Sequence, residues 1–415
     1  MTAIQKYLAP LLLLSMAACG EPSENTDGGS LPLVPLEPAR PAETTDYAAR
    51  AKEVFDLIED RYLVRDGAYR GLMRENVPAQ PGDPAASYLW SYDGWMTGVL
   101  GMHRLGYDVD YANRAELFFR YRTPGSAAAP GIPGFAPQTQ GGVGTGWGDR
   151  YYDDNSIVGI NLVDAYEETG EQRYLDAARE IVGFLRSGYD DHLGGALWWC
   201  EAAKDPHSPA ENANKPTCAN GYAACFLLDY HAICPAGEKD DVLRFALRLY
   251  DWLYTTLRDP SDNTYYNAKQ ALGGIQTMKW TYNSGVMIQN GIRLYRITGD
   301  RTYLEQAIAT AEGAGRLFIR MRSNGIAAMP DNDQWFNTKL FIALVELSRY
   351  HEPARRYVEI YERSLEYAYE HARNASGLFF EGWTNGREGR DYWLLTQTAV
   401  LESYTALALR ESPRR

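Results

Sequence analysis

The chain has 415 residues, of which 54 are acidic and 41 basic, and its formal net charge is −13. An acidic surface excludes nucleic acids and anionic membrane surfaces as main partners, because binding to both depends on Lys and Arg. Hydrophobic residues make up 45% of the chain, which is enough for a packed core. The 30 Tyr and 10 Trp are an unusual excess of amphipathic rings for an acidic protein.

The N-terminus resembles an export signal. Residues 1–18 contain an apolar run, Tyr7 to Ala18, that is too short to span a bilayer. The run ends in Ala-Ala-Cys, which resembles the lipobox of bacterial lipoproteins, so we expect Cys19 to be lipidated. Residues 19–45, rich in Glu, Pro, Ser and Gly, predict a flexible tether. We therefore expect an exported protein that is anchored to the bacterial cell envelope, at the outer membrane or cell surface, through its lipid alone. The alternative is an ordinary secretory signal whose cleavage site contains a cysteine.

Residues 46–415 are predicted to form one repetitive domain. Three stretches resemble one another and have central glycines at Gly106, Gly170 and Gly299, with separations of 64 and 129 residues. The second separation is about twice the first, which is typical of stacked supersecondary units. Each stretch has the pattern of helix, glycine turn, helix. The first helix of a pair is apolar nearly all round and the second has one apolar stripe, which predicts an inner and an outer ring.

Twelve helices can be placed along the chain, alternating between the two rings. Six alternating pairs predict an all-α (α/α)6 toroid that forms a single domain. The predicted inner helices begin near Tyr92, Asn155, Ala219, Asn283, Gln334 and Tyr392, and the outer ones near Asp46, Asp110, Arg173, Lys239, Thr302 and Pro353.

The links between these helices are unequal in length. Those from inner to outer helix are short, as at Thr169 to Gln172, whereas those from outer to inner helix are long, as at Thr123 to Tyr152. Because successive helices run in opposite directions, all long links lie on one rim, where long loops usually carry function. Nine of the ten tryptophans lie in or beside these links. Flat rings mixed with carboxylates and amides suit the CH faces and hydroxyls of sugars.

Cys200, Cys218, Cys225 and Cys234 follow one another at spacings of 18, 7 and 9 residues. This spacing contains no CxxC, and no EF-hand pattern occurs elsewhere, so we predict no metal site and no cofactor. In an oxidising compartment one or two disulfides are plausible, but the spacing leaves their pairing open.

Asp153 and Asp154 are the strongest candidates for catalysis. An Asp at a helix start is often an N-cap, and the pair Asp190-Asp191 shows that the pattern alone is common. The first pair, however, opens an inner helix after a long aromatic link. Two carboxyls in one cleft can divide into an acid and a base, and hydrolysis of a glycosidic bond requires such a pair.

Several motifs together resemble glycoside hydrolase family 76, the endo-α-1,6-mannanases. They are Tyr152-Asp-Asp-Asn155, the helix end Asp164 to Gly170, Gly194-Gly195 with Trp198-Trp199, and Thr281-Tyr-Asn-Ser-Gly285. The resemblance implies an (α/α)6 fold and a retaining, endo-acting hydrolase of α-1,6-mannan, with Asp153 as the nucleophile and Asp154 as the general acid/base. We expect a monomer.

Other residues of the same rim are predicted to bind the sugar chain. Asn283, Asn220, Asp93 and Asp149 have the alternative of a helix cap, and one of Trp198 and Trp199 that of a ring packed beneath the loop. The predicted binding residues are Asp93, Trp95, Asp149, Tyr152, Trp198, Trp199, Asn220, Tyr282, Asn283 and Trp335.

Two other functions are compatible with the sequence. One is a non-catalytic surface lipoprotein that binds glycans. The other is a different sugar enzyme on the same toroid, such as an unsaturated uronyl hydrolase or a sugar 2-epimerase. An epimerase needs rim histidines for proton transfer. Of the six histidines, His103, His231, His351 and His371 map within helices or near the short turns.

Overall fold

The computed structural model describes residues 45–139, 149–389 and 391–411. The predicted signal peptide, Cys19 and nearly all of the tether lie outside these ranges and stay predictions. Within the described ranges, no helix has the length and apolar character needed to cross a membrane.

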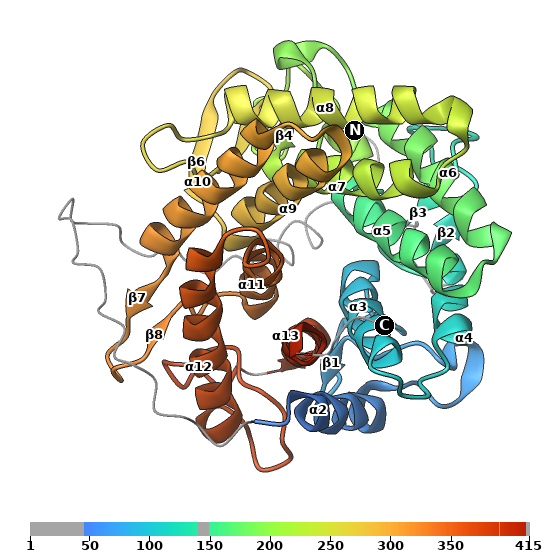
Figure 1. Cartoon of the computed structure of the whole chain (residues 1–415). Helices are drawn as coiled ribbons and strands as arrows, with labels where there is room; N and C mark the ends of the chain where they lie inside the picture. The colour runs from blue at the N-terminus through green and yellow to red at the C-terminus, as the bar shows by residue number, and fades with distance from the viewer. Residues whose placement is uncertain (1–44, 140–148, 390, 412–415) are drawn as a thin grey trace.

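The described part of the chain folds into twelve α-helices arranged as two concentric rings, which confirms the predicted toroid (Figure 1). The rings alternate along the chain, so each inner helix packs on its outer neighbour. The inner helices are α3 (Leu89–Arg104), α5 (Tyr152–Thr169), α7 (Thr217–Ile233), α9 (Thr281–Thr298), α11 (Gln334–Leu347) and α13 (Leu394–Glu411). The outer helices are α2 (Tyr47–Tyr62), α4 (Tyr111–Glu116), α6 (Gln172–Gly188), α8 (Lys239–Thr256), α10 (Arg301–Phe318) and α12 (Arg355–His371).

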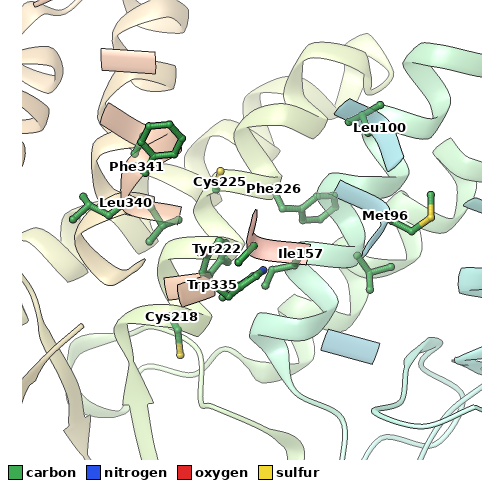
Figure 2. Close-up of a cluster of buried hydrophobic side chains, with 14 of the residues drawn as sticks. Met96, Leu100, Ile157, Cys218, Tyr222, Cys225, Phe226, Trp335, Leu340 and Phe341 are labelled. Carbon is green, nitrogen blue, oxygen red and sulfur yellow. The ribbon is translucent and has the colours of Figure 1, made fainter. Parts of the chain in front are cut away.

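The core lies between the inner helices and on their outer faces. Figure 2 shows Ile157, Tyr222, Phe226 and Trp335 converging from three inner helices. Small residues allow these helices to approach closely: a Cβ at Gly159 would lie 2.5 Å from the ring of Phe226. Packing of this density fixes the relative positions of the inner helices and of the side chains at their ends.

The short links turn on glycine as predicted. Gly170 and Gly299 follow α5 and α9 in the left-handed conformation, at φ +69° and +74°, and their N–H groups close the last helical turns. This conformation is the reason for glycine at these positions.

The long links carry short strands and 3₁₀ turns. β1 (Asn76–Val77) pairs with β9 (Tyr392–Trp393) and joins the two ends of the ring. The sequence did not predict the hairpin of β5 (Tyr266–Gln270) and β6 (Ile275–Lys279), because its polar residues show no apolar alternation. The remaining strands are β2 (Arg122–Thr123), β3 (Gly134–Phe135), β4 (Asn214–Pro216), β7 (Arg320–Met321) and β8 (Ala327–Ala328). The 3₁₀ turns are η2 (Gly67–Tyr69), η3 (Leu117–Arg120), η4 (His192–Gly194), η5 (Glu201–Ala203), η6 (Ala236–Glu238) and η7 (Glu352–Ala354).

The expected disulfides are wrong for the described cysteines. Cys200, Cys218, Cys225 and Cys234 are all free and buried. Cys218 and Cys225 lie seven residues apart on α7, about 10 Å along the helix axis, which exceeds the reach of a disulfide.

Candidate active site

Asp153 and Asp154 are the second and third residues of α5 and lie on the rim that carries the long links. The residue before the helix, Tyr151, occupies the N-cap position and makes no side-chain cap hydrogen bond. The two carboxyls therefore lie inside the first turn. The cap interpretation of this pair does not describe the structure, and both side chains keep partial exposure to solvent.

Three groups donate hydrogen bonds to the carboxylate of Asp153. The indole Nε1 of Trp199 lies 3.2 Å from Oδ2, and the Sγ of Cys218 lies 3.1 Å from the same oxygen. The backbone N–H of Asp154 lies 3.1 Å from Oδ1. Burial raises the pKa of Asp153, whereas these three donors lower it, because they stabilise the ionised form. The pKa of Asp153 stays above its usual range overall, but less far above it than that of Asp154, so Asp153 is the carboxyl of the pair that ionises first.

Asp154 has different surroundings. Within the described ranges, no group donates a hydrogen bond to its carboxyl. Burial, reinforced by the charge of Asp153, holds the pKa of Asp154 well above its usual range. Two adjacent carboxyls therefore differ in how easily they ionise, because one has three hydrogen-bond donors and the other has none among the described residues.

Asp93 lies beneath this pair, inside the ring. It is fully buried on α3, with Oδ1 3.4 Å from the amide nitrogen of Asn161, which stands two helical turns beyond Asp154 on the same face of α5. Burial and the charge of Asp154 hold the pKa of Asp93 well above its usual range, and Lys339 partly opposes this shift. Lys339 in turn makes a partly buried ion pair with Glu402, at 2.6 Å. In this structure Asp93 contacts neighbouring helices and has no exposed surface for a sugar.

Aromatic rings from four inner-helix starts gather on the same rim. Tyr282 stacks on Phe336 with ring centres 4.0 Å apart, and Trp90 contacts Trp335, Phe336 and Trp393 at 5.4 to 6.0 Å. Most of these rings are partly exposed, whereas Trp335 is buried. We name this group the rim cluster; it consists of Trp90, Trp280, Tyr282, Trp335, Phe336 and Trp393.

Tyr282 connects the rim cluster to the carboxyl pair. Its phenol interacts with the thiol of Cys218, which contacts Asp153. Next to Tyr282, the buried amide of Asn283 has no hydrogen-bond partner among the described residues. An unpaired buried amide is costly, and Asn283, like Asp93, has no exposed surface for a sugar, so a buried water is the partner that its position allows.

An ion pair holds the link that leads into the site. Arg150 and Glu201 form a bidentate pair at 2.7 and 2.9 Å, and both side chains are almost fully buried. Arg150 also donates to the backbone of Ile132. Asp149 accepts from the backbone N–H of Ala202 through both oxygens, so its side chain fastens two links together.

Besides Asp93 and Asp149, four predicted sugar-binding residues make structural contacts. Tyr152 packs on Phe184 and Trp95 packs on Phe55, both on outer helices. Successive residues of a helix point about 100° apart, so Tyr152 faces the outer ring although its neighbour Asp153 faces the site. Trp198 is fully buried and donates to Asp190 at 2.6 Å. The remaining residue of this kind, Asn220, pairs with the backbone N–H and C=O of Leu197.

Of the predicted set, the structure brings Asp153, Asp154 and Trp199 together, with Tyr282 nearby through Cys218. The sequence did not identify Cys218 as a member of the site. The signal that the sequence offered was its position, because Cys218 is the second residue of an inner helix and so lies at the rim with the carboxyl pair.

The buried partners Arg150 and Glu201 were also missed. They lie 51 residues apart in the chain and carried no local signal that one would meet the other.

The described residues contain no group of three or more His, Cys, Asp or Glu side chains that could hold a metal ion. The expectation of a site without metal or cofactor came from residue spacing and stays a prediction.

The match to a family model decides the relationship. The model described as glycosyl hydrolase family 76 matches residues 139–415, which include the carboxyl pair. The chain belongs to glycoside hydrolase family 76.

Solved structures share the fold of this family member at low sequence identity. A family 76 α-mannanase from Bacteroides thetaiotaomicron is 23% identical, with a TM-score of 0.73, covering 88% of this chain and 96% of that one. An α-1,6-mannanase from Salegentibacter sp. HEL1_6 is 20% identical, with a TM-score of 0.69, covering 88% and 100%. Dfg5 from Chaetomium thermophilum, solved with glucosamine, is 16% identical, with a TM-score of 0.67, covering 89% and 92%. A comparison with curated proteins gave no match.

Proposed function

We propose that this chain is a retaining glycoside hydrolase that cleaves internal α-1,6-mannosidic bonds of mannan. The observation that carries the proposal is the asymmetry of the carboxyl pair. Asp153 accepts three hydrogen bonds that stabilise its ionised form, the form that a nucleophile requires. Among the described residues Asp154 accepts no hydrogen bond, and its pKa is raised, as a general acid requires.

The substrate class is supported by two arguments. The Salegentibacter enzyme was solved with α-1,6-mannotetrose and α-1,6-mannotriose, in inactive variants that have two consecutive aspartates replaced. This chain likewise carries two consecutive aspartates at the start of α5. The rim cluster extends from this pair across the starts of α9, α11 and α3, which supports contact with several sugar units and hence attack within a chain.

The reaction follows from the two roles. A carboxylate oxygen of Asp153 attacks the anomeric carbon while the bond to the glycosidic oxygen breaks, and Asp154 gives its proton to that oxygen. The sugar is then held as an ester on Asp153. Asp154, now ionised, takes a proton from water, whose oxygen attacks the same carbon. The ester bond breaks, Asp153 regains its charge, and the product keeps the α configuration.

The test is hydrolysis of debranched α-1,6-mannan by the wild type and by Asp153→Asn and Asp154→Asn. We expect Asp154→Asn to lose about 10²- to 10⁴-fold in kcat, the contribution of a general acid, and Asp153→Asn to lose more. Asp191→Asn is the matched control, because Asp191 belongs to the other Asp-Asp pair and is exposed in a turn. The activity of this variant should equal that of the wild type.

The pH profile of kcat/KM should be bell-shaped. The acid limb reports protonation of Asp153, and the basic limb, displaced upward by the raised pKa of Asp154, reports loss of its proton. In Asp154→Asn the basic limb should disappear. A protein that binds mannotriose without cleaving mannan would support a glycan-binding module instead. Release of β-configured reducing ends, followed by NMR, would contradict the nucleophile role of Asp153.

A further inference from the structure

Cys218 is a buried thiol in direct contact with the carboxyl pair. It is the second residue of α7 and is 6% exposed. Its Sγ lies 3.1 Å from Oδ2 of Asp153. A thiol has one hydrogen to donate and a carboxylate has none, so the hydrogen bond runs from sulfur to oxygen.

The thiol is kept in its protonated form. Burial and the neighbouring charge of Asp153 hold the pKa of Cys218 well above its usual range. The charged and titratable groups around it are Asp153 on α5 and the phenols of Tyr222 on α7 and Tyr282 on α9. A neutral, buried thiol of this kind is a poor nucleophile and a persistent donor.

The two carboxylate oxygens of Asp153 accept different numbers of hydrogen bonds. Oδ2 accepts from both Trp199 and Cys218, so both of its lone pairs are engaged. Oδ1 accepts only from the backbone N–H of Asp154 among the described groups and keeps one lone pair. A carboxylate fixed in this way presents Oδ1, and not Oδ2, to an incoming carbon.

We propose that Cys218 is a positioning residue, whose S–H group engages Oδ2 of Asp153 and thereby makes Oδ1 the attacking oxygen. This rests on the proposed function of Asp153 as nucleophile. In the first step Oδ1 bonds to the anomeric carbon, and the glycosidic oxygen leaves with the proton of Asp154. In the second step water replaces Oδ1, and the carboxylate that departs is stabilised again by Cys218 and Trp199. The thiol itself is neither oxidised nor alkylated.

The kinetic test compares Cys218→Ala, Cys218→Ser and Cys225→Ala. We expect Cys218→Ala to lower kcat about tenfold, the effect of one hydrogen bond to a charged group. Its acid limb should also move to higher pH, because the ionised Asp153 loses a donor. Cys218→Ser keeps a donor and should recover most of the rate. Cys225→Ala removes a thiol of similar burial from the same helix, away from the pair, and should leave both kcat and the acid limb unchanged.

A second measurement requires no substrate. The infrared S–H stretching band of Cys218, assigned by its loss in Cys218→Ser, should lie at lower frequency than that of Cys225. It should rise in Asp153→Asn, because an amide is a weaker acceptor than a carboxylate.

The outcomes separate this inference from the proposed function. A band that does not respond to Asp153→Asn would overturn the hydrogen bond, and equal kcat values for Cys218→Ala and Cys225→Ala would overturn the positioning role. If the wild type does not hydrolyse α-1,6-mannan, the proposed function fails, and the infrared comparison alone decides whether the thiol engages Asp153.

Discussion

At the scale of single residues, the site depends on how hydrogen-bond donors are distributed between two neighbouring carboxyls. Trp199 and Cys218 reach Asp153 from a long link and from a neighbouring inner helix, whereas Asp154 faces buried surroundings without a described donor. The two aspartates share a helix turn, so intrinsic chemistry does not distinguish them. Their environments do, and they give Asp153 and Asp154 the different properties that the proposed roles of nucleophile and acid require.

Trp199→Phe tests this distribution. The change removes the indole N–H that lies 3.2 Å from Oδ2 of Asp153 and keeps an aromatic ring. We expect kcat to fall about tenfold and the acid limb of the pH profile to move upward, because one donor to the ionised form is lost. Steady-state kinetics across the acid and basic limbs would measure both effects.

Trp198→Phe is the control for this change. Trp198 is fully buried and donates to Asp190, not to Asp153, so its replacement should lower the melting temperature and leave the pH profile in place. If Trp199→Phe kept the wild-type kcat and acid limb, the donor role of Trp199 would be wrong.

At the scale of elements, buried polar contacts fasten the long links to the inner helices. The fourth residue of α5, Asn155, pairs with the backbone N–H and C=O of Phe135. The fourth residues of α7 and α13, Asn220 and Gln397, do the same with their own preceding links. These amides satisfy backbone groups that would otherwise be buried without partners. The repeated contact explains how irregular links hold the side chains of the candidate site in place.

The Arg150–Glu201 pair joins two such links, and Arg150→Met should break it. Because Glu201 would remain buried and charged without a partner, we expect the free energy of unfolding to fall by about 3–5 kcal/mol. The double variant Arg150→Met/Glu201→Met should recover much of the loss, since it leaves no unpaired charge. Urea denaturation would measure both.

The exposed pair Arg186–Asp241 gives the matched control for this prediction. Its side chains are 43% and 59% exposed, so Arg186→Met should cost no more than about 1 kcal/mol. Equal losses for the two single variants would contradict the stabilising role of the buried pair.

At the scale of the whole molecule, the last inner helix closes the ring. α13 packs on α3 and on α2, and β1 pairs with β9, so residues more than 300 positions apart become neighbours. α3 approaches α13 closely because glycines face it. A Cβ at Gly101 would lie 2.5 Å from Cβ of Thr405. Closure therefore depends on small residues at one helix crossing.

Gly101→Ala should weaken the closure. The added methyl group forces α3 and α13 apart, and we expect a loss of about 1–3 kcal/mol in unfolding free energy, the usual cost of overpacking. Gly183→Ala is the control: no atom lies within 4 Å of its added Cβ on α6, so it should be neutral or stabilise by up to about 1 kcal/mol. In thermal unfolding, the melting temperature of Gly101→Ala should fall below that of the wild type, whereas that of Gly183→Ala should stay equal or rise. Equal melting temperatures for the two variants would contradict the close approach of α3 and α13.

The sequence alone was sufficient for the toroid and for the rim that carries the acidic pair. Helical periodicity, the glycines Gly170 and Gly299 and the unequal links are local properties of the chain, so they predicted twelve helices in the right order and the rim that carries Asp153 and Asp154. The direction of individual side chains was a different matter. Tyr152 and Asp153 are neighbours in the chain, yet only the packing of the inner helix α5 against the outer helix α6 decides that the tyrosine faces outward.

Contacts between distant segments were decided by the tertiary structure alone. Cys218 lies 65 residues from Asp153, and Glu201 lies 51 residues from Arg150, and no spacing rule connects either pair. The sequence thus determined which elements form and which rim holds the acidic pair, because hydrophobic periodicity and turn chemistry act over a few residues. The donors that make one aspartate differ from the other came only with folding, because hydrogen bonds and burial depend on what the closed ring brings within about 3 Å.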